Sequence, residues 1–373
     1  MRKLLTSIAL ATTLALGATA AEAASLEQMA GQMILVGFKG DGVGDASIKT
    51  LIGEIAKGQI GGVMYLKTNV TTLAAVKAMN AAFKAASPTL PPFISLDQEG
   101  GRVQRLTSDV GFAEMPSAQD VSRNDTPAEA RAIYLKTAKA LAGLGFNLNF
   151  GPVVDLNVNP DNPIIGKYGR SFGTDPNRVA QYASAFIEAH REAGVLTALK
   201  HFPGHGSSTS DSHKGFVDIS STWSPTELVP YKLLLKGDKI DLVMVGHLYD
   251  KHHDVPGDKL QLPASLSSVW IGKVLREQLG YQGVVISDDL DMGAIRNMFK
   301  GAGDAGILRQ TVIKAVNAGV NVLLFSDTAA YDPKLGAQVQ SILVDEANKD
   351  PAFAARIEAS YRLIAALKGK LKG

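Results

Sequence analysis

The sequence predicts a single-domain α/β protein, a (β/α)8 barrel of the TIM type. Eight short apolar segments recur along the chain, and longer amphipathic segments with helical periodicity separate them. Apolar runs of this length are typical of parallel strands that are buried on both faces. Eight evenly interleaved strand–helix units favour a closed barrel over a doubly wound open sheet, which rarely needs eight.

The connecting segments supply the second part of the pattern. Helical periodicity is clear at 126–145 and 175–194, where Thr126 and Asp175 are candidate N-caps and Gly143 and Gly194 are candidate stops. No linker, low-complexity segment or charge run divides the chain, which indicates one domain. The predicted strands, in order, are residues 32–38, 61–66, 92–97, 147–156, 196–202, 241–248, 283–290 and 321–327.

Residues 1–23 have the pattern of a secretory signal peptide. Two basic residues precede an apolar run over 4–16, and the triplet AEA at 21–23 resembles a cleavage site. The apolar run is too short to span a bilayer. We therefore expect a protein that is exported to the periplasm or secreted, with a mature barrel over 24–373.

Composition excludes several classes of protein. The chain has 38 Lys and Arg against 36 Asp and Glu, and without residues 1–23 the balance is 36 − 35 = +1. Such a balance gives no electrostatic footprint for nucleic acid or an anionic membrane, and no later apolar stretch is long enough for a membrane anchor. There is no cysteine, which excludes disulfides, thiolate chemistry, cysteine zinc sites and a lipid-anchored N-terminal cysteine.

Ionisable residues gather where the predicted strands end. Six of the eight strands deliver at least one: Asp97, Asp155, Lys200 with His201, His247, Asp288 with Asp289, and Asp327. In a parallel barrel the carboxyl ends of the strands meet at one face, and the loops there build the active site. A barrel with a purely structural role does not need this collection, so we expect a functional site at this face.

The segment KHFPGHGSSTSDSHK at 200–214 holds three of the seven histidines. His201, His205, His213 and Asp211 have the chemistry of metal ligands, but Pro203 and Gly204 break the spacing that would place two histidines on one helical face. The segment has no Gly-x-Ser-x-Gly elbow and no phosphate-binding loop. We interpret His205 as a residue that holds the loop backbone.

The end of this segment offers a proton donor. Asp211 lies two residues before His213, and a carboxylate at this spacing can orient an imidazole and raise its proton affinity, as a general acid/base requires. Asp288 and Asp289 end a predicted strand, so at most one of them should face the barrel mouth. A strand-end carboxylate and a proton donor on a loop are what a retaining glycosidase needs.

These motifs resemble the family-three glycoside hydrolases. KHFPGHG followed by DSH, together with SDDL-M, is most similar to the single-domain bacterial β-N-acetylglucosaminidases that act on peptidoglycan fragments. DQEGGRVQR at 97–105, GPVVDLN at 151–157 and GRSFG at 169–173 also match family segments in the same order. The resemblance covers nearly the whole chain after residue 23.

The resemblance implies a role for each matching residue. Asp288 would be the nucleophile, His213 the acid/base and Asp211 the residue that polarises it. The substrate would be a carbohydrate that contains N-acetylglucosamine, such as a muropeptide, and neither metal nor other cofactor would be required. Contacts to the sugar would come from Asp97, Arg105, Arg170, Lys200 and His201, and, by its position alone, His247.

Some features depart from this pattern or stay open. Relatives that recycle peptidoglycan are often cytoplasmic, whereas this chain has an export pattern. Asp291 stands where a small polar residue is usual, and we interpret it, like Asp327, as an acid beside a helix start. Glycines 204, 206 and 215 would let the loop of His213 move. Nothing in the sequence indicates the oligomeric state.

Other functions are alternatives. A β-glucosidase of the same family usually takes its acid/base from a second domain, which this chain has no room for. A phosphorylase would use phosphate in place of water as the acceptor. A metal-dependent hydrolase and a non-catalytic sugar-binding barrel are the candidates from other classes, and the latter would need neither a nucleophile nor a proton donor.

Overall fold

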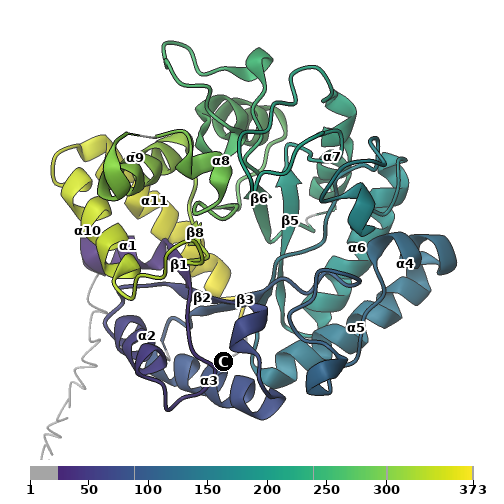
Figure 1. Ribbon diagram of the computed structural model, residues 1–373, viewed down its shortest axis with the longest axis horizontal. Helices are drawn as coiled ribbons and strands as arrows, with labels where there is room; N and C mark the ends of the chain where they lie inside the picture. Colours follow the sequence, from purple (N-terminus) through teal and green to yellow (C-terminus); the bar gives the residue numbers. More distant parts are fainter. Residues whose placement is uncertain (1–23, 88, 238, 300, 372–373) are drawn as a thin grey trace, which may run out of the picture.

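The structure is a computed structural model, and it describes residues 24–371 except 88, 238 and 300. The predicted signal segment 1–23 therefore lies outside the described residues. Within them, eight parallel strands form one sheet in the order β7-β6-β5-β4-β3-β2-β1-β8. Figure 1 shows the helices as an outer ring around these strands. The single-domain (β/α)8 barrel that the sequence predicts is confirmed.

Seven of the eight strands are shorter than predicted, and β5 has its predicted bounds. The strands are β1 (Ile34–Gly37), β2 (Gly62–Tyr65), β3 (Phe93–Leu96), β4 (Leu148–Asn149), β5 (Leu196–Phe202), β6 (Leu242–Val245), β7 (Val284–Ser287) and β8 (Leu323–Phe325). Every residue of these strands is buried, as expected for strands that face the barrel interior on one side and helices on the other. The ring closes between β7 and β8, where Ile286 pairs with Val322.

The fourth strand departs most from its prediction over 147–156. It ends at Asn149 because Pro152 has no backbone N–H to donate, and the peptide bond between Gly151 and Pro152 is cis. An isolated parallel bridge between Val153 and Lys200 resumes the pairing. The segment after β4 therefore stays bonded to β5: Ala198 N donates to the carbonyl oxygen of Gly151, Lys200 N to that of Pro152, and Val154 N to that of Lys200.

Helices cover the sheet in the expected alternation. They are α1 (Leu26–Gln32), α2 (Ala46–Ala56), α3 (Leu73–Ala86), α4 (Ala118–Asn124), α5 (Pro127–Leu144), α6 (Pro176–Glu192), α7 (Val229–Leu235), α8 (Gly293–Arg296), α9 (Gly303–Ala318), α10 (Leu335–Ala347) and α11 (Pro351–Lys368). A π-helix over Val269–Gln278 precedes β7. α1 and α11 pack together, so the two ends of the described chain meet.

The predicted helix caps are mostly confirmed. The Thr126 side chain accepts a bond from Glu129 N in a capping box, and Asp175 accepts one from Asn177 N. Gly194 follows the C-cap of α6 with φ +77°. The prediction for Gly143 is wrong: it lies inside α5, and Gly145, with φ +96°, ends the helix, because only the residue that turns left-handed needs to lack a side chain.

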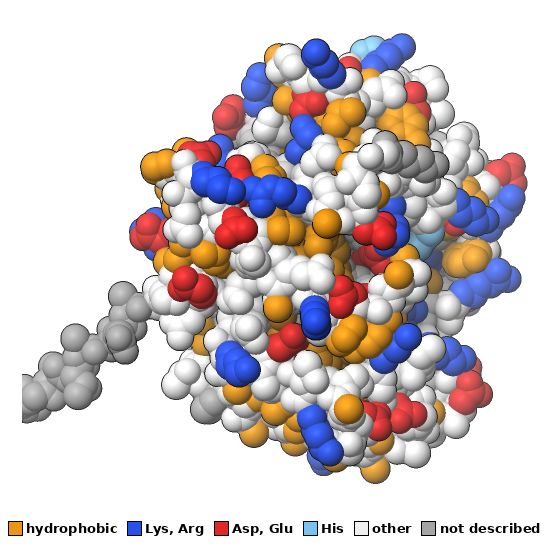
Figure 2. Space-filling view, turned by 60° about the vertical axis from the view of Figure 1, so that its left-hand side comes forward, with side chains coloured by type: hydrophobic (Ala, Val, Ile, Leu, Met, Phe, Trp, Pro, Cys, Tyr) orange, Lys and Arg blue, Asp and Glu red, His pale blue; other side chains and the backbone are white. Residues whose placement is uncertain are grey.

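The distribution of surface charge and the hydropathy of the helices match what the composition predicts. On the face shown in Figure 2, basic and acidic side chains are interspersed, and neither sign forms a continuous patch. Among residues 24–371, with the three gaps, no helix has both the length and the apolarity to cross a membrane.

Candidate active site

A cavity of about 400 Å³ opens at the carboxyl ends of the strands. Its size is in the range of ordinary small-molecule sites. The predicted residues that line it are Asp97, Arg105, Arg170, Lys200, His201, His213 and Asp288. Lys200 and His201 lie on β5 and the others follow β3, β4, β5 or β7, so the barrel brings together residues that lie far apart in the chain.

Cations and carboxylates alternate on one wall of the cavity. Nζ of Lys200 lies 2.6 Å from Oδ1 of Asp97 and 2.6 Å from Oε1 of Glu99. Arg105 donates to Oδ2 of Asp97 at 2.7 Å. Arg170 donates from Nε and Nη2 to the two carboxylate oxygens of Glu99, at 2.7 and 2.8 Å. Such bidentate pairs fix the guanidinium plane, so this wall is rigid.

Glu99 is a residue of the site that the sequence analysis missed. Burial alone would raise its pKa, but Arg170 and Lys200 outweigh burial and lower it to about 2. Asp97 has the same balance: burial acts to raise its pKa, and Lys200 and Arg105 lower it. Both carboxylates are therefore charged at neutral pH. The available signal was the position of Glu99, a second acid two residues after the end of an apolar strand.

The tautomer of His201 follows from its partners. Arg170 can only donate, so at 3.3 Å its Nη2 makes His201 Nε2 the acceptor. The ring proton is then on Nδ1, which donates to Asp155 at 2.7 Å. Asp155 also accepts the backbone N–H groups of His201 and His205, at 3.1 and 2.8 Å. The buried carboxylate of Asp155 thus orients His201 toward the cavity without contacting a ligand itself.

Asp288 and Asp289 differ from the prediction in their placement. β7 ends at Ser287, so neither lies on the strand, and both line the cavity. Burial acts to raise the pKa of Asp288, but His247, His201 and His213 lower it, which leaves an ionised carboxylate.

Burial raises the pKa of Asp289 to about 6. Oδ1 of Asp289 accepts the N–H groups of Asp291 and Ser326, the supporting role expected for one of the two.

His247 lies behind the cavity and is not among the side chains that line it. Its Nε2 donates to the carbonyl oxygen of Asp289 at 2.8 Å, so its Nδ1 accepts from Oγ of Ser265 at 2.7 Å. Burial lowers the pKa of His247. Its contribution is to support the segment of Asp288, not to form the wall that we expected.

The predicted acid/base pair is present as a hydrogen-bonded pair. Nδ1 of His213 lies 2.8 Å from Oδ1 of Asp211, which also accepts the backbone N–H of His213 at 3.0 Å. Burial acts to raise the pKa of Asp211, and the bonds from His213 lower it. The carboxylate therefore stays charged, as a residue that polarises an imidazole must. His213 lines the cavity, and its side chain is 63% exposed.

Two strand-end acids make contacts outside the cavity. Asp291 accepts from Arg296 at 2.8 Å and from Ala329 N at 3.0 Å, so it joins two loops and does not cap α8. Asp327 has a left-handed φ of +53° and accepts from Asp332 N at 2.9 Å. Asp291 lies directly before the N-cap Met292 of α8, beside a helix start as expected, whereas Asp327 lies well before the start of α10.

The candidate metal ligands have other partners. His201 binds Asp155, His213 binds Asp211, and His205 lies between Ser208 and Ser212. Within the part of the chain that the structure describes, no group of three or more potential ligands has the geometry to hold a metal ion.

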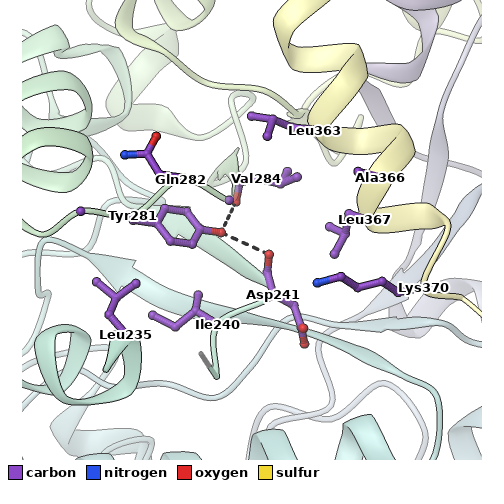
Figure 3. A pocket seen from close by; sticks show the side chains of 12 residues that line it. Leu235, Ile240, Asp241, Tyr281, Gln282, Val284, Leu363, Ala366, Leu367 and Lys370 are labelled. Atoms are coloured by element: carbon purple, nitrogen blue, oxygen red, sulfur yellow. Dashed lines mark hydrogen bonds between the residues drawn. The ribbon is translucent and has the colours of Figure 1, made fainter. Parts of the chain in front are cut away.

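A second cavity, of about 380 Å³, lies at the opposite end of the barrel (Figure 3). Its wall includes the residues just before β6 and β7 and the end of α11. Tyr281 donates there to the carbonyl oxygens of Asp241 and Val284, and the Asp241 carboxylate is bound by Arg191 and Thr197. Barrel enzymes place their chemistry at the other face, so this cavity is not the candidate active site.

The barrel thus holds an ionised carboxylate and a histidine–aspartate pair at one polar cavity. A comparison with known families gives the class of protein. Residues 25–359 match the model described as "Glycosyl hydrolase family 3 N terminal domain". The chain therefore belongs to glycosyl hydrolase family 3, and the resemblance predicted from its motifs is confirmed.

Individual relatives place it among the hexosaminidases of this family. The chain is 36% identical over 301 residues to "Beta-hexosaminidase LpqI" of Mycobacterium tuberculosis, which covers 79% of this chain and 72% of that protein. It is 32% identical to "Beta-hexosaminidase A" of Pseudoalteromonas piscicida over 95% of this chain, and spans 63% of that longer protein. Among solved structures, a β-N-acetylhexosaminidase from Beutenbergia cavernae superposes with a TM-score of 0.79 at 30% identity, over 93% of this chain and 99% of that one.

Proposed function

We propose that the protein is a retaining exo-β-N-acetylglucosaminidase that removes terminal β-linked N-acetylglucosamine. The observation that carries the proposal is that Asp288 and His213 line the same cavity, with Asp211 bonded to the ring of His213. The preference for an acetamido sugar rests on the names of the relatives, which are hexosaminidases.

The proposed reaction has two steps. In the first, the Asp288 carboxylate attacks the anomeric carbon while the glycosidic C–O bond breaks, and His213 gives its proton to the leaving oxygen. In the second, His213 takes a proton from water, which attacks the same carbon and releases the Asp288 carboxylate. Two displacements at one carbon retain its configuration. The ionised state of Asp288 supports its role, because a nucleophile must be unprotonated.

The cation–carboxylate wall would bind the sugar. Lys200, Arg105 and Arg170 can donate to hydroxyl and acetamido oxygens, while Asp97 can accept from hydroxyl groups. Because these side chains already bind one another, they are preorganised and lose little conformational entropy when the sugar binds. His201, with its proton on Nδ1 bound to Asp155 and its Nε2 bound by Arg170, is held in place at the edge of this wall.

We further propose that the natural substrate is a peptidoglycan fragment and that the protein is exported as one catalytic domain over 24–373. The export part rests on the basic, apolar and AEA pattern of residues 1–23. A wall-remodelling or nutritional role outside the cytoplasm is compatible with that location, as is recycling of fragments in the periplasm.

Initial rates on an aryl β-N-acetylglucosaminide and on the matching aryl β-glucoside, both in EDTA, test this proposal. We expect a strong preference for the acetamido sugar and no loss in the chelator. A preference for the glucoside would favour a β-glucosidase, and a rate that requires added phosphate would favour a phosphorylase. No turnover of either substrate would favour a sugar-binding barrel. Activity lost in EDTA and restored by zinc would favour a metal-dependent hydrolase.

A further inference from the structure

The loop that carries His213 needs a support that its exposed end does not provide. The side chain of His213 is 63% exposed, and its ring is bonded to Asp211, its own neighbour in the loop. A general acid must nevertheless be held within hydrogen-bond reach of the oxygen that it protonates. Gly293 N and Ala294 N bind the backbone carbonyl oxygens of His213 and Ser212, and a buried side chain also holds this loop.

His205 lies directly beneath this loop and is completely buried. Its Nδ1 is 2.7 Å from Oγ of Ser208, and its Nε2 is 3.3 Å from Oγ of Ser212. Ser212 stands between the two members of the acid/base pair in the chain, and its own side chain is buried. The imidazole thus spans the loop from its start to the residue beside the acid.

The backbone of His205 is anchored to neighbouring loops of the barrel. The backbone N–H of His205 donates to Asp155 at 2.8 Å, and its carbonyl oxygen accepts from Asn162 Nδ2 at 2.8 Å. The same amide nitrogen of Asn162 lies 3.0 Å from Oγ of Ser208.

Gly206, the residue after His205, has no space for a side chain, since an added Cβ would lie 1.6 Å from the Leu156 carbonyl oxygen. Gly206 is therefore needed for close packing, and not only for the loop mobility that the sequence predicts.

The protonation state of His205 suits this position. Burial lowers its pKa to about 4, so the ring is neutral at neutral pH, with one donor nitrogen and one acceptor nitrogen. A serine hydroxyl can donate or accept, so either tautomer satisfies both hydroxyl groups. A charged ring would instead carry a buried, unpaired cation into the loop.

We infer that His205 is a positioning residue for acid catalysis: it holds Ser212, and through Ser212 the Asp211–His213 pair, over the cavity. The inference rests on the proposed function, in which His213 protonates the leaving oxygen. His205 makes no hydrogen bond to Asp288 or His201 among the described contacts, although its ring packs edge to face against that of His201 at 5.8 Å and it lines the same cavity. Its replacement should therefore impair proton donation more than sugar binding.

Leaving-group dependence tests this selectivity. The substrates are aryl β-N-acetylglucosaminides with leaving groups from a dinitrophenol, which departs without a proton, to phenol, which needs one. For His205→Phe we expect kcat/KM to fall by about 100-fold on the phenyl substrate and by less than about threefold on the dinitrophenyl substrate. Ser212→Ala removes one of the two hydroxyl partners and should show the same pattern more weakly, which keeps the test valid if His205→Phe does not fold.

His190 provides the matched control. It is also completely buried, its pKa is also lowered to about 4 by burial, and it binds Asn149 and the carbonyl oxygen of Phe186 away from the loop. His190→Phe should change all substrates by the same factor. Equal losses across the series for His205→Phe and Ser212→Ala, or no loss, would overturn the inference. If His213→Ala also shows no leaving-group dependence, the proposed function itself fails.

Discussion

Nζ of Lys200 lies 2.6 Å from Oε1 of Glu99, and the same carboxylate receives two bonds from Arg170. Glu99 is thus the shared anchor of two cations that we expect to contact the sugar. Its own side chain is buried, and among the described residues the side chains that bind its carboxylate are those of Lys200 and Arg170. The geometry of the sugar-binding wall depends on this carboxylate, although it need not touch the substrate.

Glu99→Gln removes the charge with little change of shape. We expect KM to rise by at least about tenfold, with a smaller change in kcat, because Lys200 and Arg170 lose the partner that orients them for binding. The free energy of unfolding should fall by about 3–5 kcal/mol, since two buried cations lose a counter-charge. Steady-state kinetics and denaturant unfolding measure the two effects.

Glu192→Gln is the control for this change. Glu192 also accepts from an arginine, Arg131, at 2.6 Å, but both side chains are well exposed to solvent. Its loss should cost less than about 1 kcal/mol and leave KM unchanged. An unchanged KM in Glu99→Gln would show that the wall keeps its geometry without this carboxylate.

Lys368 makes stability depend on pH at the opposite end of the barrel. It is buried, and its Nζ lies 2.7 Å from Oε1 of Gln32 and 2.7 Å from the carbonyl oxygen of Gly61. Burial lowers its pKa from 10.5 to about 7. Between these values the unfolded chain binds the proton more strongly, so the free energy of unfolding should rise with pH from 7 toward 10.5.

Lys368→Met should remove this dependence. Chemical unfolding at several pH values, compared between the wild type and the variant, measures the difference. Lys370→Met is the matched change, because Lys370 is exposed two residues further on, and it should leave the slope unchanged. A wild-type slope that Lys368→Met does not alter would contradict the prediction.

Gly293 fixes the distance between the acid/base loop and the nucleophile segment. Gly293 N donates to the carbonyl oxygen of His213 at 3.2 Å, and Ala294 N donates to that of Ser212 at 3.1 Å. A Cβ at Gly293 would lie 2.7 Å from the His213 carbonyl oxygen. Gly293→Ala should therefore displace the loop and lower kcat/KM by about 10- to 100-fold, as for a misplaced catalytic group.

A glycine with open space around its Cα provides the control for Gly293→Ala. Gly143 lies inside α5, and an added Cβ meets nothing within 4 Å. Gly143→Ala should raise the free energy of unfolding by about 0.5–1 kcal/mol without affecting the rate. Normal activity in Gly293→Ala would mean that the loop does not depend on this contact.

The sequence predicted the residues of the cavity well because each follows an apolar strand or stands in a spaced motif. A parallel barrel converts this local signal into proximity, since all strand ends meet at one face. Asp97, Lys200, His201 and Asp288 were found in this way, and all line the cavity.

The sequence could not predict the partnerships between these residues. Glu99 pairs with Arg170, 71 positions away, and with Lys200 on another strand. Periodicity carries no information on contacts of this range. His247 was misplaced for a related reason: the end of its strand does reach the cavity face, but the side chain binds Asp289 and Ser265 behind the cavity.

The sequence also did not predict where most of the strands end. Adjacent side chains point to opposite faces only on a strand. Asp288 and Asp289 were predicted to lie on one, but β7 ends at Ser287. Beyond that point the backbone no longer alternates, and both side chains reach the cavity. The end of β4 is a similar case: the regular strand stops at Asn149, although Lys200 N still donates to the carbonyl oxygen of Pro152 and Val154 N to that of Lys200.

The central claim is that Asp288 forms a covalent bond to the sugar. The most direct test is incubation with 5-fluoro-N-acetylglucosaminyl fluoride, whose ring fluorine slows both steps while the good leaving group favours the first. Mass spectrometry of the digested protein should then show one added sugar on the peptide that contains Asp288, and none in Asp288→Asn. Rapid turnover without any labelled peptide, or a label on a carboxylate other than Asp288, would contradict the account.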